Sequence, residues 1–274
     1  MNRLTTPDIT IVVPTRNEVQ NIDPLVRRTA AAMAGAGLTW EMLVVDDSDD
    51  DTPARVHRHA AAGMPVRLLH RSPGQRVDGL SGAVSAGFRD AWGDVLAVMD
   101  ADLQHPPEVL PELVAAVSQV HVQIAIASRY CRGAGSDATD GLDGPWRLLV
   151  SQMCRWLVWL VRPRLWGVRD PLAGFFMVRR DVLAGVVLRP TGYKILLELL
   201  ARGNWTNVVE VPYRFAAREA GTSKSELRQG LIFLQHLVRL AIDRGSGAGV
   251  VTPEVIDLTD FGLTVPPDLA RPRR

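Results

Sequence analysis

Cysteine is scarce in this sequence, and this scarcity narrows the kinds of site that the chain can build. Cys131 and Cys154 are its only cysteines, too few and too far apart for a disulfide framework or a cysteine-ligated metal site. This usage fits a reducing, cytoplasmic setting best. The formal net charge is only +1, so bulk charge indicates neither nucleic acid nor an acidic partner. We therefore expect no partnership with nucleic acid.

Long apolar segments are also missing. The first ten residues, MNRLTTPDIT, contain no apolar run, so no signal peptide is expected. No stretch reaches the ~18 uncharged apolar residues that a membrane span needs. The longest candidate, residues 148–161, is interrupted by Arg155. Any contact with a membrane is therefore expected to be peripheral or to depend on an anchoring partner.

What the sequence does contain is a regular alternation of buried strands and helices. Apolar runs predict strands at residues 9–13, 41–47, 66–70, 94–100, 122–130 and 205–215, and residues 173–183 predict a strand that turns into a helix. Segments of helical periodicity lie between most of them, which is typical of an α/β fold with a mostly parallel sheet flanked by helices. Residues 72–87 contain G-x-x-G but not the G-x-G-x-x-G dinucleotide fingerprint, which disfavours a redox enzyme.

Polar side chains gather where four of these predicted strands end. The segments are PTRNE (14–18), DDSDDDT (46–52), DADLQH (100–105) and SRY (128–130). In an open parallel sheet, ligands bind beyond the carboxyl ends of the strands. The four segments together predict a pocket that attracts a cation and a polyanion.

The third of these segments places Asp100, Asp102 and Gln104 two residues apart. In an extended chain such residues point to the same side, so they are expected to line one wall. Adjacent carboxylates repel unless a cation lies between them, and oxygen-only ligands suit Mg²⁺ or Mn²⁺ completed by substrate phosphates. The alternative is a solvated turn in which Asp102 caps the following helix.

Two other features leave alternatives open. Asp46 and Asp47 end the second strand, where a carboxylate could accept hydrogen bonds from a nucleobase or ribose. The rest of that acidic run is also consistent with an ordinary turn and helix cap. The small residues of 72–87 fit close helix packing as well as a position near a sugar nucleotide.

Taken in order, these motifs resemble the family-2 glycosyltransferases of the GT-A fold, and more narrowly the dolichol-phosphate (polyprenyl-phosphate) mannose synthases. The resemblance covers about residues 9–242 and rests on IVVPTRNE, VVDDSDDDT, VMDADLQHPPE, IASRY, RDPLAGFFMVRR, GYKILLELL and REAGTSK. It implies a GT-A catalytic domain over residues 1–215, with an amphipathic interface helix at 145–166. An acceptor-phosphate loop and a C-terminal helix are expected at 216–244, and the aperiodic residues 245–274 predict a disordered tail.

The activity that the resemblance implies is metal-dependent, inverting transfer of mannose from GDP-mannose to polyprenyl monophosphate. It would take place at the cytoplasmic face of a membrane, with no covalent nucleophile. The alternative is transfer of glucose or another hexose from a UDP- or other nucleotide sugar, to polyprenyl phosphate or to a different acceptor. A catalytically silent nucleotide-sugar binder or partner subunit is a further alternative.

The resemblance also assigns roles to individual positions. The residues expected to border the nucleoside and its sugar are Pro14, Thr15, Glu18, Asp46 and Asp47. The diphosphate and a divalent ion, Mg²⁺ or Mn²⁺, are expected at Asp100, Asp102 and Gln104. The phosphates of donor and acceptor are expected to face Arg129, Arg147, Arg218, Ser223 and Lys224. Among all of these, the predicted catalytic residues are Asp102, Arg129, Arg218 and Lys224. Arg16 stands where relatives usually have an aromatic residue, so base stacking there would need its guanidinium.

The chemistry of such a transfer accounts for the arginines that follow residue 129. A phosphate monoester has a second pKa near 6, so at neutral pH the acceptor is already largely an ionised nucleophile. Bringing two anions together requires cationic side chains more than a strong base. Asp170 is expected to orient a sugar or a basic partner, or to cap a turn. The Trp- and Arg-containing residues 145–166 suit a membrane interface, or packing on the domain or in a dimer.

Overall fold

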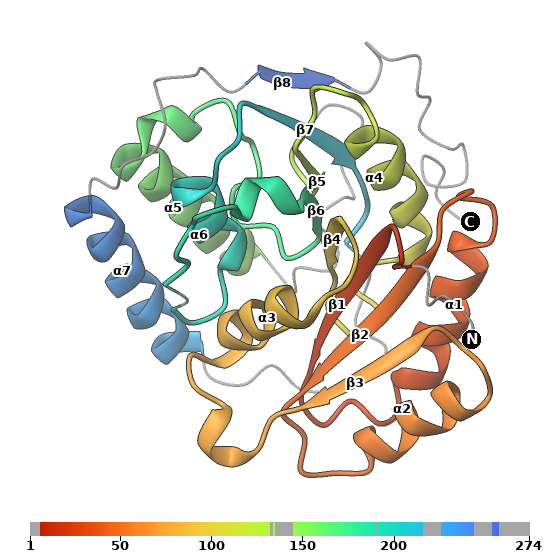
Figure 1. Ribbon diagram of the computed structural model, residues 1–274. Helices are drawn as coiled ribbons and strands as arrows, with labels where there is room; N and C mark the ends of the chain where they lie inside the picture. The colour runs from red at the N-terminus through yellow and green to blue at the C-terminus, as the bar shows by residue number, and fades with distance from the viewer. Residues whose placement is uncertain are drawn as a thin grey trace.

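The computed structural model describes residues 6–131, 134, 145–189, 191–215, 226–243 and 254–257, with the backbone alone at 145–147, 226–229 and 254–257. Its described part is built around one twisted sheet with helices on both faces (Figure 1).

The sheet contains eight strands in the described residues, in the spatial order β3-β2-β1-β4-β6-β5-β7-β8. In chain order the strands are β1 (Ile9–Thr15), β2 (Trp40–Asp46), β3 (Val66–His70), β4 (Val95–Val98), β5 (Ile124–Ser128), β6 (Phe176–Arg179), β7 (Asn207–Pro212) and β8 (Glu254–Asp257). All neighbouring pairs are parallel except those made by β6, which is antiparallel to both β4 and β5. The predicted mostly parallel sheet is confirmed.

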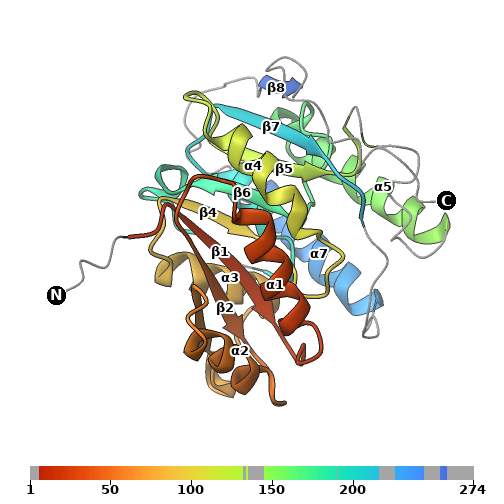
Figure 2. The same cartoon turned by 90° about the vertical axis from the view of Figure 1, so that its right-hand side faces the viewer.

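The helices divide between the two faces of this sheet. They are α1 (Ile22–Met33), α2 (Thr52–Ala61), α3 (Gly79–Asp90), α4 (Leu110–Val117), α5 (Pro145–Val161), α6 (Ile195–Arg202) and α7 (Glu226–Ile242). Their buried side chains place α1, α2 and α4 on one face and α3, α5, α6 and α7 on the other. Figure 2 shows α1 and α4 in front of the strands when the molecule is turned by 90°.

Strand β1 shows how the sequence directs this layering. Successive side chains of a strand point to opposite faces, so Ile11 packs with the α1 and α4 side while Val12 packs with the α3 side. Both side chains are completely buried. Burial of each contributes about 1.5–3 kcal/mol, which is why a continuous apolar run forms the centre of a sheet covered on both faces.

The amphipathic segment predicted at 145–166 is not one helix. Helix α5 ends at Val161, and a separate 3₁₀ turn follows at Pro163–Leu165. Pro163 has no backbone N–H, and its ring obstructs a continuing α-helix, so the chain breaks there. Arg162, at φ −130°, connects the two elements.

The predicted disordered tail also needs a correction. Residues Glu254–Asp257 form β8, which pairs with β7 in parallel along the register Asn207↔Glu254 to Glu210↔Asp257. The tail therefore contributes the edge strand of the sheet there. The remaining tail residues, and the predicted acceptor-phosphate loop at 216–225, lie outside the described residues.

Candidate active site

The carboxyl ends of the parallel strands bring the sequence motifs together at one edge of the sheet. Strands β1, β2 and β4 run side by side, with Pro14 opposite Val45 and Val12 opposite Val98. Because β6 is antiparallel, its first residue, Phe176, lies at the same edge, opposite Val98. The loop that precedes β6 therefore joins the site.

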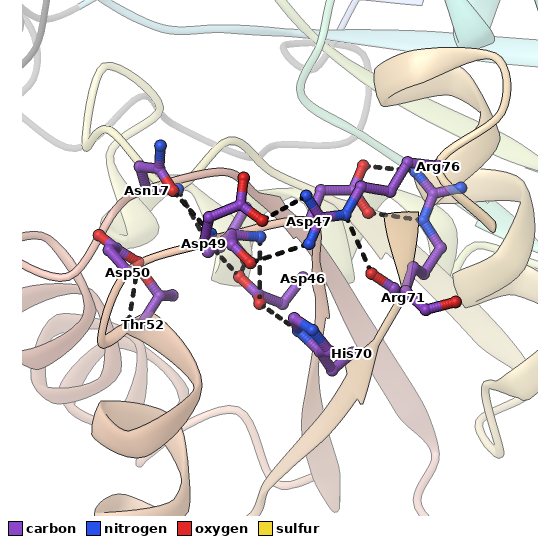
Figure 3. A network of polar contacts seen from close by, with 12 residues as sticks. Asn17, Asp46, Asp47, Asp49, Asp50, Thr52, His70, Arg71 and Arg76 are labelled. Carbon is purple, nitrogen blue, oxygen red and sulfur yellow. Dashed lines mark hydrogen bonds and ion pairs between the residues drawn. The ribbon is translucent and has the colours of Figure 1, made fainter. Parts of the chain in front are cut away.

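Asp46 is the centre of a buried network beneath the first two strand ends (Figure 3). Its carboxylate accepts hydrogen bonds from the Thr15 hydroxyl at 2.7 Å and the Ser48 hydroxyl at 2.5 Å, and His70 Nδ1 lies 2.7 Å away. The Asp46 side chain has no exposed surface. The prediction that it contacts a nucleoside does not fit this geometry, since its oxygens are already used. Asp46 instead supports the loops, and Thr15 and Pro14 are buried with it.

Asp47 is held by Arg71, which the sequence analysis did not single out. Arg71 donates from Nε to Oδ1 at 2.8 Å and from Nη2 to Oδ2 at 2.6 Å, a bidentate pair with both side chains nearly buried. Arg71 also donates to the carbonyl oxygens of Gln75 and Gly79. The segment at 72–79 is therefore tied to the end of β2. The sequence signal that could have indicated this pair is an arginine-containing segment that follows the acidic run 46–52.

The acidic loop after β2 is shaped by further paired groups. Arg76 donates to Asp49 Oδ1 at 2.7 Å and to the Ser48 carbonyl at 3.0 Å, as Figure 3 shows. Asn17, at φ 61°, donates its N–H to the Ser48 hydroxyl and accepts from the Asp49 N–H. Asparagine tolerates this left-handed conformation better than most residues. Next to it, Glu18 is partly exposed at the rim, and its Oε2 accepts a hydrogen bond from Asn21 Nδ2 at 2.6 Å.

The Asp100 segment is a turn, so the reasoning from strand spacing was wrong. Strand β4 ends at Val98, and Leu103 has φ 63°, which an extended strand does not adopt. Asp102 Oδ1 accepts the Gln104 N–H at 3.2 Å. The Asp100 side chain is 35% exposed and Asp102 is partly exposed, whereas Gln104 is buried. The two carboxylates are therefore the accessible donors of this wall.

A metal ion here would need oxygen atoms from a substrate. Within the described residues, no group of three or more His, Cys, Asp or Glu side chains could hold an ion by itself. Two accessible carboxylates fit Mg²⁺ or Mn²⁺, which keep several waters and are usually completed by phosphates. The donor set at Asp100 and Asp102 is thus compatible with such an ion.

His105 supports Asp100 from inside the protein. Its Nδ1 accepts the Asp100 backbone N–H at 3.0 Å, and its ring stacks on Phe175 with centroids 5.3 Å apart. Burial lowers the pKa of His105 to about 4, so the ring is neutral near pH 7. The 3.4 Å approach of Nδ1 to the Asp100 carboxylate is therefore not an ion pair. A Cβ at Gly174 would lie 2.9 Å from His105 Cε1, so only glycine fits there.

Arg129 and Asp170 form a buried ion pair across the site. Arg129 donates from Nε to Oδ2 at 2.9 Å and from Nη2 to Oδ1 at 3.1 Å, and its backbone N–H also reaches Oδ2. Burial alone would raise the pKa of Asp170, but the guanidinium outweighs burial and holds that pKa below its ordinary value. Of the three roles open for Asp170, orienting a basic partner is the one observed. Its partner is the predicted phosphate-binding Arg129.

Glu210 on β7 anchors the loop that carries Asp170. Its carboxylate accepts the Arg169 N–H at 3.1 Å and the Asp170 N–H at 2.8 Å, and the residue is 2% exposed. Burial, with a smaller contribution from the Asp170 charge, raises the pKa of Glu210 to about 7. The sequence pattern does not reveal Glu210, because it lies inside an otherwise apolar strand, 40 residues from its partner.

Two further basic groups lie near the Arg129–Asp170 pair: Lys194, which is partly buried, and Arg155, which is buried. Lys194 Nζ donates to the Leu172 carbonyl at 2.9 Å and interacts electrostatically with Arg129, Asp170 and Asp100. The guanidinium of Arg155, on α5, lies 3.9 Å from the centre of the Tyr130 ring. Lys194 was missed, although it belongs to the GYKILLELL motif.

The remaining predicted phosphate ligands cannot be placed. Arg218, Ser223 and Lys224 lie outside the described residues, and so does the side chain of Arg147. Their predicted roles stay predictions.

Comparisons with known proteins agree with this architecture. The profile described as "Glycosyl transferase family 2" matches residues 10–186. A dolichol-phosphate mannosyltransferase from Pyrococcus furiosus is 36% identical over 252 residues, covering 92% of this chain and 68% of the relative. Another from Mycosarcoma maydis is 34% identical, covering 86% of this chain and 79% of the relative.

A solved structure shares the fold at lower sequence identity. It is glucosyl-3-phosphoglycerate synthase from Mycobacterium tuberculosis in complex with Mn²⁺, uridine diphosphate and glucosyl-3-phosphoglycerate. Its TM-score is 0.61 at 20% identity, covering 89% of this chain and 81% of that one. The predicted GT-A fold is confirmed by this likeness and by the family match. The chain therefore belongs to glycosyltransferase family 2 and is a glycosyltransferase.

Proposed function

We propose that this enzyme transfers mannose from GDP-mannose to polyprenyl monophosphate, with inversion and with a divalent metal ion, at the cytoplasmic face of a membrane. The observation that carries the proposal is the meeting of two opposite features at one edge of the sheet. Partly exposed carboxylates at Asp100 and Asp102 follow β4, and the buried Arg129 after β5 pairs with Asp170 from the loop before β6. A reaction that joins two anionic substrates needs both.

On the donor side, Asp100 and Asp102 would hold Mg²⁺ or Mn²⁺. The bound ion supplies Lewis-acid stabilisation of the departing nucleoside diphosphate. Glu18, partly exposed at the rim, is the acidic group that we assign to the nucleoside, whereas Asp47 is nearly buried and keeps both oxygens on Arg71. Neutral His105 keeps the Asp100 backbone in place without adding a charge.

On the acceptor side, Arg129 is the described group that would bind phosphate. Asp170 fixes its Nε and Nη2, so the guanidinium is oriented before the substrate arrives. A phosphate monoester is largely ionised at neutral pH and can attack the anomeric carbon directly. The side chain therefore positions and attracts the nucleophile rather than removing a proton from it.

The membrane surface would lie against α5 and α7, which pack together. Apolar side chains form an exposed stripe on α5 at Leu149 (50%), Met153 (55%), Trp156 (58%) and Leu160 (77%). A matching stripe on α7 consists of Leu231 (66%), Leu234 (54%), Val238 (55%) and Ile242 (78%). Arg162 links the two elements by donating to the Leu240 and Asp243 carbonyls. Helices with one exposed apolar stripe suit the bilayer interface.

None of the helices in the described ranges is both long and apolar enough to cross a bilayer.

The first test is transfer of labelled sugar by the purified chain. GDP-mannose, GDP-glucose, UDP-glucose and UDP-galactose are each offered with a polyprenyl phosphate, with 3-phosphoglycerate, and with or without EDTA. The expected product is mannosyl-phosphoryl-polyprenol, formed only without EDTA. Asp102→Asn should lower turnover at least about 100-fold, whereas the exposed control Asp181→Asn should not. Transfer from no donor to polyprenyl phosphate would contradict the proposal, and UDP-glucose as the better donor would favour the alternative sugar.

The second test is flotation with anionic vesicles. Leu160→Glu combined with Ile242→Glu should abolish co-flotation. Val120→Glu serves as the matched control, because Val120 is 95% exposed but lies after α4, away from both stripes. Equal loss in both variants, or no loss in either, would remove the argument for this face.

A further inference from the structure

Lys194 occupies a position between the two halves of the site described above. It directly precedes α6, and its Nζ donates to the carbonyl of Leu172, in the same loop as Asp170. This carbonyl is the only acceptor that the described residues supply to it. An ammonium group has three N–H donors, so two of them have no acceptor within the described residues and can serve a ligand.

Charged and titratable groups from every side act on this amine. Arg129 approaches from the end of β5, Asp170 from the loop before β6, Asp100 from the end of β4 and Cys154 from α5. Its neighbour Tyr193 places a ring centroid 4.7 Å from Nζ. Arg129 already donates to both oxygens of Asp170, so the negative charge of Asp170 acts on the Lys194 amine only through longer-range electrostatics. Lys194 and Arg129 thus repel each other, while Asp170, whose charge acts on both, is hydrogen-bonded to Arg129.

This arrangement favours an incoming anion. Burial, and then repulsion by Arg129, lower the pKa of Lys194 to about 8, so the free protein carries its charge at a cost. An anion between Lys194 and Arg129 would interact favourably with both groups and relieve their repulsion. Phosphate oxygens match the N–H donors of an ammonium group.

We propose that Lys194 binds a phosphate group of the substrates, placed between the donor wall at Asp100 and the acceptor arginine at Arg129. The inference rests on the proposed function, since it assumes that phosphorylated substrates meet here. The phosphate can be the diphosphate of the nucleotide sugar or the monophosphate of the polyprenol. Lys194 is then a catalytic residue that stabilises negative charge at the reaction centre.

The chain has few lysines, so the reactivity of the Lys194 amine can be measured directly. Lys194 and Lys224 are the only lysines among 31 lysine and arginine residues. Amine acetylation by acetic anhydride therefore modifies few sites, and mass spectrometry can follow the Lys194 peptide separately. Only the neutral amine reacts, so the rate as a function of pH gives the pKa of that amine.

The labelling experiment uses the intact protein between pH 6 and 10. The Lys194 rate should titrate near 8, against about 10.4 for the same peptide in urea-denatured protein. GDP-mannose with Mg²⁺ and farnesyl phosphate are then added separately, with mannose and farnesol as controls that lack phosphate. Protection of at least about tenfold by either phosphorylated probe, but not by its control, supports the proposal and identifies the source of the phosphate. Protection by neither phosphorylated probe, or equal protection by the controls, overturns it.

Variant kinetics supply a second readout that a purely structural role would not change. The wild-type kcat/KM should fall above about pH 8, because this profile reports the free enzyme. Lys194→Arg keeps the positive charge, so the fall of kcat/KM at alkaline pH should move beyond pH 9. Lys194→Met should lower kcat/KM about 100-fold. An unchanged alkaline limb in a folded Lys194→Arg protein contradicts the assignment. Protection without any sugar transfer would instead refute the proposed function and leave the phosphate site standing.

Discussion

The replacement Asp170→Asn tests the ion pair at the centre of the site. Asp170 is completely buried, and the Arg129 side chain is 10% exposed. Asparagine has nearly the same shape but only one acceptor oxygen. Its NH2 group would therefore face one N–H donor of the Arg129 guanidinium, and that hydrogen bond would be lost. The variant therefore leaves a buried cation without its counter-charge, at almost constant volume.

The expected loss of folding stability depends on how deeply the ion pair is buried rather than on its contact geometry. Breaking a buried pair by removing one partner costs about 3–5 kcal/mol. The pair of Arg28 with Glu108 is also bidentate, at 2.9 and 2.8 Å, but its side chains are 34% and 47% exposed. Glu108→Gln should cost about 0–1 kcal/mol, because water screens such pairs. The two variants thus compare the loss of the same bidentate contact in a buried ion pair and in a partly exposed one.

Urea unfolding followed by circular dichroism measures both losses. The midpoint should fall strongly for Asp170→Asn and slightly for Glu108→Gln, with unchanged slopes. Adding Arg129→Met to Asp170→Asn should recover part of the stability, because the uncompensated charge disappears with the guanidinium. Equal losses in the two single variants, or a double variant less stable than Asp170→Asn, would refute the reasoning.

Three further variants probe the surroundings of this pair. The folded state binds the Glu210 proton more tightly than the unfolded state does. The free energy of unfolding of the wild type should therefore fall by about 3 kcal/mol as pH rises from 4.5 to 7. Glu210→Gln should reduce this pH dependence, as measured by urea unfolding at a series of pH values. Gly174→Ala should weaken binding of GDP with Mn²⁺ about tenfold by calorimetry, since its Cβ would displace His105 and Asp100, whereas Gly35→Ala meets no neighbour and should bind normally. Arg162→Ala should speed hydrogen exchange at the C-terminal turn of α7 while leaving α1 unchanged, because two carbonyls lose their donor.

The strands could be predicted because their signal is local. In the run of residues 9–13, every position except Thr10 is apolar, and β1 is buried throughout. Once the strands are parallel, their carboxyl ends must share an edge, so the positions of Asp47, Asp100 and Arg129 at that edge followed from the sequence pattern.

The groups that orient those residues could not be predicted in the same way. Asp170 lies 41 residues from Arg129 and reaches it only because β6 runs antiparallel between β4 and β5. A short strand such as β6, with the sequence FMVR, carries no information on strand direction. Glu210 is a single acid within an apolar strand, and its partners are backbone N–H groups, which have no sequence signature.

The same buried groups explain how the site can favour anions while the whole chain is almost neutral. Arg129 is paired with Asp170, and the positive charge of Arg155 is balanced by the negative charge of Asp100, which leaves Lys194 and Glu210 to set the local charge. Their pKa values, about 8 and about 7, mean that near neutral pH the amine is mostly protonated and the carboxyl is about half protonated. The cluster therefore carries a net positive charge between zero and one. A bound phosphate would raise both pKa values, so the positive charge that holds the ligand grows as the ligand arrives.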